Sequence, residues 1–297
     1  MLNLPWEAEK SEEKMMKKTM MAVAALSATV AMADVVSSDV VGYANVGLNA
    51  GGKNMIGPCF VTVGANTVKL SELKVTGYEG SEYYLTEELG FSASFQRRAS
   101  NGMPYATYVW TDSTDDMETW NGGKWLDAST MEEVTALNDV ILKPGDGLWF
   151  TTPDLHDCTG FSLTTSGAVL KGSQAFELNA GGKIGVANMM PASVKLSEIE
   201  IQGYEDSEYY LTEELGFSMS MQSLKSNGMP LVTYVWTDST DDMETWDGGK
   251  WLNASTMEEI TSENDVTVAA GEGFWATCPD LHDCEKFTFV VPGVLTE

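Results

Sequence analysis

Residues 107–135 have the sequence TYVWTDSTDDMETWNGGKWLDASTMEEVT, and residues 233–261 repeat it as TYVWTDSTDDMETWDGGKWLNASTMEEIT. Three positions differ between the two segments. Each segment contains a run of β-branched and aromatic residues, then an acidic stretch, then a glycine pair between two tryptophans, a pattern typical of strands joined by turns. The near-identity indicates a tandem duplication, so we expect the same fold in both halves of the chain.

The duplication extends over most of the chain. From Lys69 and Lys195 onward, equivalent positions lie 126 residues apart, whereas the earlier motif LNAGGK recurs at a spacing of 130. Changes of length are tolerated best in loops, so we place a loop between these two points. Each copy has a normal size for a self-sufficient domain. We therefore predict two tandem homologous domains, residues 34–169 and 170–297.

Short runs of strand-forming residues alternate with glycine, proline, asparagine and aspartate in both copies. The runs recur roughly every ten residues, without long intervening helices. A short helical candidate, VKLSEL, lies at residues 68–73. This spacing predicts an all-β fold in which each domain is a β-sandwich or barrel with at most short helices.

The N-terminal region has the layout of a secretory signal peptide. Two lysines precede an apolar run at residues 20–32, which ends in the small-residue pattern AMA and predicts cleavage before Asp34. We assign residues 1–33 to this peptide and predict a secreted protein, released to the periplasm, the cell surface or the extracellular medium. Residues 1–14 precede the usual start of such a peptide, and our hypothesis is that they arise from a misplaced start codon; the alternative is a genuine long N-terminal region of the signal peptide.

The chain is strongly acidic, with 44 acidic and 17 basic residues and a net charge of -27. Removing residues 1–33 leaves this charge unchanged, because they contain four acidic and four basic residues. Such a field repels nucleic acid and attracts divalent cations, so we expect no nucleic-acid partner. The sequence after the signal peptide contains no apolar run of about 20 residues, so we also expect no membrane span.

An acidic stretch in each copy is the candidate cation site, with four carboxylates within seven residues. Calcium prefers six to eight oxygen ligands, which carboxylates, hydroxyls and carbonyls of such a loop can supply. The spacing differs from that of a helix–loop–helix calcium loop, so a solvated acidic turn is the alternative. We expect no other cofactor. The calcium candidates are Asp112, Asp115, Asp116, Glu118, Asp238, Asp241, Asp242 and Glu244.

Tryptophans follow each acidic stretch and are the candidate ligand-binding residues. Exposed rings on a β-hairpin can stack on sugars, whereas buried rings would close the core of a sandwich. Two hairpin registers are open, with the turn at Asn121-Gly122 or at Gly122-Gly123. We expect Trp110 and Trp149, in alternating apolar strands, to belong to the core. The ligand candidates are Trp120, Trp125, Trp246 and Trp251.

No set of catalytic motifs in the sequence converges on one site. Both histidines lie in the motif PDLHDC, where neighbours along the chain point in different directions, so a zinc or Cys-His site lacks its remote partners. Arg97 and Arg98 are replaced by Ser223 and Leu224 in the second copy, which argues against a shared anion site. We therefore predict that the protein is not an enzyme.

The four cysteines follow the predicted cleavage site, and an exported chain meets oxidising conditions. Of the three pairings, Cys278 with Cys284 and Cys59 with Cys158 keep each disulfide within one domain. A link between Cys158 and Cys284 is an alternative that would tie the domains together.

Two motifs carry a family resemblance. The stretch LNAGGKNMIGP at residues 48–58 and the late strands GDGLWF and GEGFWA are similar to an uncharacterised module of secreted bacterial proteins. The segment SSDVVGYANV after the signal peptide is similar to the opening of such proteins. The resemblance implies an extracellular β module and no particular activity. The second copy departs from the opening motif, with LNAGGKIGVANMMP at residues 178–191.

These observations predict a secreted, acidic, non-catalytic structural or adhesive protein built of two tandem β domains. The alternative is a glycan-binding protein with one aromatic site per domain, assisted by calcium. The expected partner is a second copy, for example through addition of the DVVGYANVGL segment to an open sheet edge, or a cell-surface glycan.

Overall fold

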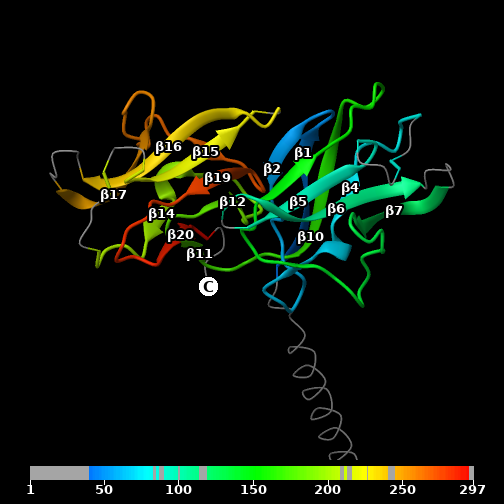
Figure 1. Cartoon of the computed structure of the whole chain (residues 1–297), viewed down its shortest axis with the longest axis horizontal. Helices are drawn as coiled ribbons and strands as arrows, with labels where there is room; N and C mark the ends of the chain where they lie inside the picture. The colour runs from blue at the N-terminus through cyan, green and yellow to red at the C-terminus, as the bar shows by residue number, and fades with distance from the viewer. Residues whose placement is uncertain are drawn as a thin grey trace, which may run out of the picture. The chain divides into compact units, whose positions relative to one another are not determined.

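The structure is a computed structural model that describes residues 40–293 except 83–84, 87–89, 100, 114–118, 208–210, 213–215, 226 and 240–244 (Figure 1). The predicted signal peptide and its N-terminal extension lie outside the described residues. The first repeat contains β1 (Val41–Asn49), β2 (Lys53–Ile56), β3 (Val68–Lys69), η1 (Leu70–Glu72), β4 (Lys74–Thr76), β5 (Ala93–Arg98), β6 (Pro104–Ser113), β7 (Thr119–Asp127), β8 (Ile141–Leu142), β9 (Leu148–Thr151) and β10 (Gly160–Ala168). The second contains β11 (Gln174–Asn179), β12 (Lys183–Ala187), β13 (Val194–Lys195), η2 (Leu196–Glu198), β14 (Glu200–Gln202), β15 (Met219–Leu224), β16 (Pro230–Ser239), β17 (Thr245–Asn253), β18 (Thr267–Val268), β19 (Gly273–Thr277) and β20 (Lys286–Val291).

Both repeats have the same three antiparallel sheets. A five-stranded sheet has the order β2-β9-β5-β6-β7 in the first repeat and β12-β19-β15-β16-β17 in the second. A three-stranded sheet, β1-β10-β4 or β11-β20-β14, and a pair of two-residue strands complete each repeat. Within the helical candidate VKLSEL, only Leu70–Glu72 is helical and forms the 3₁₀ turn η1, whereas Val68–Lys69 is strand β3. The prediction of an all-β fold with at most short helices is confirmed, and no helix in the described part of the chain is long and apolar enough to cross a membrane.

The apolar core of each repeat lies between its five-stranded and three-stranded sheets. Figure 1 shows these two layers in the second repeat, where β15, β16 and β19 lie above β11, β14 and β20. Alternate residues of a strand share one face, so Phe95, Tyr108, Trp125 and Phe150 pack together. In the second repeat the phenylalanines of the core occupy other positions. Positions equivalent to Phe95, Phe150, Leu148 and Leu163 hold Met221, Ala276, Phe274 and Phe289, so that each repeat keeps two phenylalanines among these four sites. Cores tolerate such simultaneous apolar exchanges when the total volume changes little, and here the net change is that two leucines are replaced by a methionine and an alanine.

The tryptophan hairpin differs from both predicted registers. Strand β7 continues through Asn121-Gly122-Gly123, and Trp110 pairs with Trp125 across the β6–β7 ladder. The β6–β7 connection therefore falls at residues 114–118. Gly123 lacks a side chain because a Cβ atom there would lie 2.2 Å from the indole of Trp110. The glycine pair thus makes room for a tryptophan and does not form a turn.

The boundary predicted between residues 169 and 170 lies in the link between β10 and β11. Residues Val41–Glu297 form one compact unit that contains both repeats. The division into two independent domains stays a prediction that separate expression of each repeat would test.

Candidate functional site

Asp112 and Asp238 are the two calcium candidates that the structure describes. The carboxylate of Asp112 accepts a hydrogen bond from the backbone N–H of Leu85 at 2.9 Å, while its own N–H donates to the carbonyl of Leu85 at 3.0 Å. Asp238 and Leu211 repeat this arrangement. Partial burial raises the pKa of Asp112, and the hydrogen bond from Leu85 opposes that rise. The two carboxylates therefore hold the backbone at Leu85 and Leu211 against the ends of β6 and β16.

The other calcium candidates, Asp115, Asp116, Glu118, Asp241, Asp242 and Glu244, lie outside the described residues. Within the residues that the structure does describe, no group of three or more histidine, cysteine or carboxylate side chains is arranged to hold a metal ion. The calcium site therefore stays a prediction about the β6–β7 and β16–β17 connections.

Trp125 and Trp251 are buried in the core, each with 1% of its surface exposed. The Trp125 indole donates a hydrogen bond to the carbonyl of Leu73, and the Trp251 indole donates to the carbonyl of Ile199. Their rings therefore differ from the exposed platforms that sugar stacking needs, because packing satisfies both the apolar face and the N–H group. The side chains of Trp120 and Trp246 lie outside the described ones, and the glycan-binding interpretation rests on these two.

Trp110 belongs to the core as predicted, and its indole donates to the hydroxyl of Tyr78 at 2.9 Å. Trp236 and Tyr204 form the same pair at 2.9 Å. Trp149, which we also expected in the core, is instead half-buried where the two repeats meet, as described below.

The second aspartate of the PDLHDC motif holds a distant chain segment in place in each repeat. Asp157 accepts hydrogen bonds from the hydroxyl of Ser81 at 2.7 Å and from the backbone N–H of Glu82 at 2.6 Å. Asp283 accepts a hydrogen bond from Ser207 in the same way. These bonds hold the pKa of Asp157 below its usual value. A structural role for the aspartate follows directly from the geometry.

Cysteine pairing differs from the sequence-based prediction. All four cysteines are free thiols, so neither predicted disulfide, Cys278 with Cys284 or Cys59 with Cys158, is present. Cys158 and Cys284 instead donate to the carbonyls of Gly160 and Lys286, at 3.1 Å and 3.2 Å. Burial raises the pKa of Cys59 to about 11 and that of Cys278 to about 12.

The two repeats meet through backbone contacts that occur in equivalent pairs. The N–H of Gly57 donates to the carbonyl of Gly271 at 2.9 Å, and the equivalent N–H of Ala187 donates to the carbonyl of Gly145 at 3.0 Å. Two further pairs of β-bridges exchange roles in the same manner: Ile56 with Glu272 and Asp146 with Val186, and Lys53 with Asn227 and Asn101 with Lys183. Contacts that recur with exchanged roles define an approximate two-fold axis. We call this contact region the junction.

Aromatic rings and cations lie at the junction. The rings of Trp149 and Trp275, which are equivalent residues, have centroids 5.9 Å apart. The guanidinium carbon of Arg98 lies 5.2 Å from the first ring centroid and 5.5 Å from the second, and the amine of Lys183 lies 5.3 Å from that of Trp275. Desolvation lowers the pKa of Arg98, and the negative ring faces compensate part of that cost. The cluster ties β5 and β9 to the second repeat.

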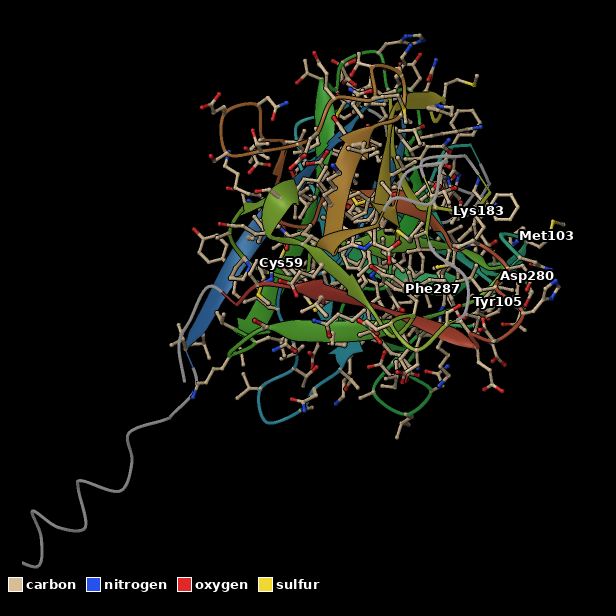
Figure 2. All side chains as sticks on the ribbon, turned by 90° about the vertical axis from the view of Figure 1, so that its left-hand side faces the viewer. Cys59, Met103, Tyr105, Lys183, Asp280 and Phe287 are labelled. Atoms are coloured by element: carbon tan, nitrogen blue, oxygen red, sulfur yellow. The ribbon has the colours of Figure 1, made fainter. Side chains whose placement is uncertain are left out.

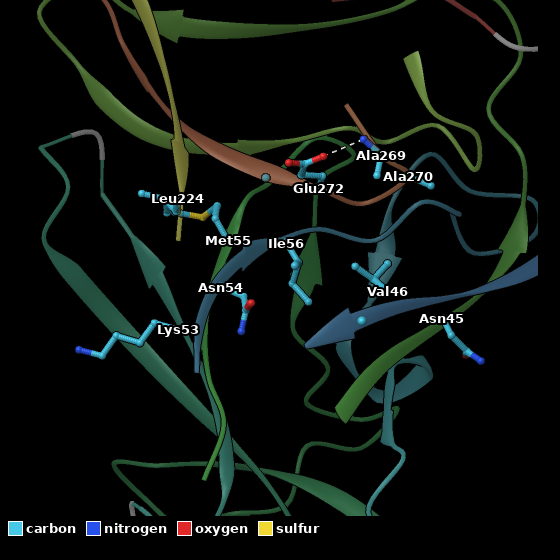
Figure 3. A pocket seen from close by; sticks show the side chains of 12 residues that line it. Asn45, Val46, Lys53, Asn54, Met55, Ile56, Leu224, Ala269, Ala270 and Glu272 are labelled. Carbon is cyan, nitrogen blue, oxygen red and sulfur yellow. Dashed lines mark hydrogen bonds between the residues drawn. The ribbon is translucent and has the colours of Figure 1, made fainter. Parts of the chain in front are cut away.

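A pocket of about 440 Å³ opens beside this cluster, between β1 and β2 of the first repeat and the turn before β19 of the second (Figure 3). Its wall combines apolar side chains with an amide, a carboxylate and a lysine. The lining residues used below are Val46, Lys53, Asn54, Leu224, Ala270 and Glu272.

Large apolar side chains are exposed at equivalent places on the two repeats. Met103 and Tyr105 at the start of β6 are 62% and 58% exposed, and Met229 and Leu231 at the start of β16 are 60% and 58% exposed. Figure 2 shows Met103 and Tyr105 projecting from the ribbon, whereas Phe287 lies inside it. We call these four residues the arm patch, because they lie on the hairpin arms β5–β6 and β15–β16.

Sequence reasoning missed the junction and the pocket, although two signals pointed toward them. The glycine-aromatic motifs GDGLWF and GEGFWA contain Trp149, Trp275 and the carbonyls that bond across the junction. The exchange of Arg97 and Arg98 for Ser223 and Leu224 also falls there. Comparisons of the chain with protein-family models, with curated proteins and with solved structures find no match. The resemblance to a secreted bacterial module stays a prediction.

Proposed function

We propose that the chain is a secreted, non-catalytic structural or adhesive protein that associates through the arm patch. The observation that carries this proposal is the exposure of large apolar side chains at equivalent positions in both repeats. Isolated exposed apolar residues are normal, but pairs of large apolar groups that recur at equivalent positions of two repeats favour an interaction surface on each arm. The bridges of Asn101 and Asn227 hold both arms against the junction.

Strand β1 is a second candidate contact surface. It lies at the edge of the sheet β1-β10-β4, and its sequence VGYANVGLN contains no charge and no proline. Val41 and Tyr43 on this strand are exposed. An uncharged edge strand is a template for pairing with another strand. Neutral edges favour self-association in a chain that otherwise repels itself through its net charge of -27.

Sedimentation velocity over a concentration series tests the proposal. We expect the protein to form dimers or larger species, more strongly in roughly 0.5 M salt than at low ionic strength, because salt screens the repulsion between acidic surfaces. A variant with serine at Met103, Tyr105, Met229 and Leu231 should shift toward the monomer. Leu137→Ser, at a fully exposed site outside both surfaces, is the matched control. A wild-type protein that stays monomeric in both salts contradicts the proposal.

A further inference from the structure

Several positions that line the pocket carry smaller residues than the equivalent positions on the other side of the junction. Val46 packs against Gly271, whereas the equivalent Phe176 packs against Gly145 and extends to the ring of Phe289, with centroids 4.8 Å apart. Ala269 and Ala270 likewise stand where the first repeat has Lys143 and Pro144. The smaller side chains at positions 46, 269 and 270 therefore contribute to the space, whereas Met55 is larger than its equivalent, Gly185.

The two sides also differ in charge. Asp146 in the first repeat has the guanidinium of Arg97 near enough to lower its pKa, although burial raises the pKa more strongly. Glu272 is the equivalent carboxylate in the pocket, and Ser223 replaces that arginine. The carboxylate of Glu272 accepts the N–H of Ala269 at 2.8 Å, and no ion pair of Glu272 is found among the residues that the structure describes. The first repeat thus supplies a cation that the second repeat lacks.

Two other groups at the pocket determine what can enter it. Asn54 lines the wall, and its buried Nδ2 atom has no hydrogen-bond partner, whereas the equivalent residue of the second repeat is Ile184. Because Nδ2 is buried, the amide must turn toward the pocket to meet a ligand, and the cost of an unpaired buried donor favours such a turn when an acceptor oxygen is present. Lys53 also lines the pocket, and Figure 3 shows its side chain extending away from Glu272. Its ammonium group is therefore not paired with the carboxylate of Glu272.

We propose that this pocket binds a small aliphatic cation that also carries a hydroxyl or carbonyl oxygen. The cationic group lies beside Glu272, and the amide of Asn54 donates to the oxygen. The aliphatic body contacts Val46 and Leu224. A volume of about 440 Å³ lies within the range of small-molecule sites. The inference is independent of the proposed association through the arm patch, because Val46, Asn54 and Glu272 are not part of that surface. Val46 does lie on β1, the second candidate contact surface, so the test below also includes a variant at Glu272 that leaves β1 unchanged.

The test uses three probes of matched length on the purified protein. 5-Amino-1-pentanol carries both groups, pentylamine lacks the hydroxyl and 1-pentanol lacks the charge. In amide NMR titrations we expect 5-amino-1-pentanol to bind with a dissociation constant of a few millimolar, as suits so small a ligand, and to shift signals of the lining residues. Pentylamine should bind a few-fold more weakly and 1-pentanol about tenfold more weakly.

Variants taken from the other side of the junction make the test specific. Val46→Phe introduces the residue found at position 176 and should abolish binding, while Phe176→Val on the opposite side should leave it unchanged. If Val46→Phe does not fold, Glu272→Gln keeps the shape of the wall and should weaken 5-amino-1-pentanol about tenfold, with no effect on 1-pentanol. Equal affinity for the amine and the alcohol, an unchanged affinity in Glu272→Gln, or no saturable shifts at the lining residues would overturn the proposal.

Discussion

The two sides of the junction share a backbone and differ in their side chains. On one side Phe176, Pro144 and Arg97 fill the space and balance a carboxylate, and on the other side Val46, Ala270 and Ser223 leave a pocket with Glu272 on its wall. The hydrogen-bonded tryptophan and tyrosine pairs of the cores show the opposite behaviour, since they are identical in both repeats. The contrast shows that a buried side chain with a specific hydrogen-bond partner was kept after duplication, whereas side chains at the contact between the repeats, like the apolar residues exchanged within the cores, were free to change.

The largest effect is expected from a clash at the shared backbone of the junction. A Cβ atom at Gly147 would lie 2.5 Å from the backbone of Gly185. Gly147→Ala should therefore lower the free energy of unfolding by about 3 kcal/mol, because backbone atoms cannot move aside as a flexible side chain can. Urea unfolding measures the loss. Gly80→Ala, which meets nothing within 4 Å, is the control. A loss below about 0.5 kcal/mol for Gly147→Ala would show that the repeats do not depend on this contact.

A smaller loss, equal in the two repeats, is expected in the cores. Trp125→Phe and Trp251→Phe each remove a buried indole and leave the carbonyl of Leu73 or Ile199 without its donor. Each should cost about 2 kcal/mol from lost packing and the unpaired carbonyl. Unfolding of the two variants under the same conditions gives the comparison. Losses that differ by more than about 1 kcal/mol would mean that the cores are not equivalent.

Alkaline pH should weaken both repeats in the same way. Burial raises the pKa of Tyr78 and of Tyr204 from the ordinary value near 10 to about 12 in the folded state. Above about pH 10 the unfolded chain loses these protons and the folded chain keeps them, so the stabilisation is present below pH 10 and lost as the pH rises toward 12. Urea midpoints from pH 8 to 11 should fall. The double variant Tyr78→Phe and Tyr204→Phe should show a flatter pH dependence, and an unchanged slope would refute this account.

The smallest effect concerns thiol reactivity, where the repeats differ again. Cys278 stands where the first repeat has Thr152, and burial raises its pKa to about 12. Because the thiolate is the reactive form, Cys278 and Cys59 should alkylate slowly with iodoacetamide at pH 8. Cys158 is half-buried and should react first. Peptide mass analysis gives the order of labelling, and equal rates for Cys158 and Cys278 would contradict it.

The sequence predicts the strands and the core well, because period-two alternation and repetition report directly on packing. The pairing of Trp110 with Trp125 was not foreseen, since a glycine pair usually signals a turn, and here Gly123 makes room for an indole. The candidate site was harder still. The positions of Glu272 and Asn54 at one pocket depend on how two repeats contact each other, and no local pattern encodes that contact.

Strands β2 and β12 each lie at one edge of a five-stranded sheet, and this position has a consequence for the newly synthesised chain. Each is covered by the other repeat, and their first residues, Lys53 and Lys183, are 130 positions apart in the chain (183 - 53). At a ribosomal speed of roughly 5 to 20 residues per second, the edge of β2 waits on the order of ten seconds before β12 is made. A nascent chain that ends before β12 therefore leaves the edge of β2 open to pairing with a neighbouring chain on the same polysome.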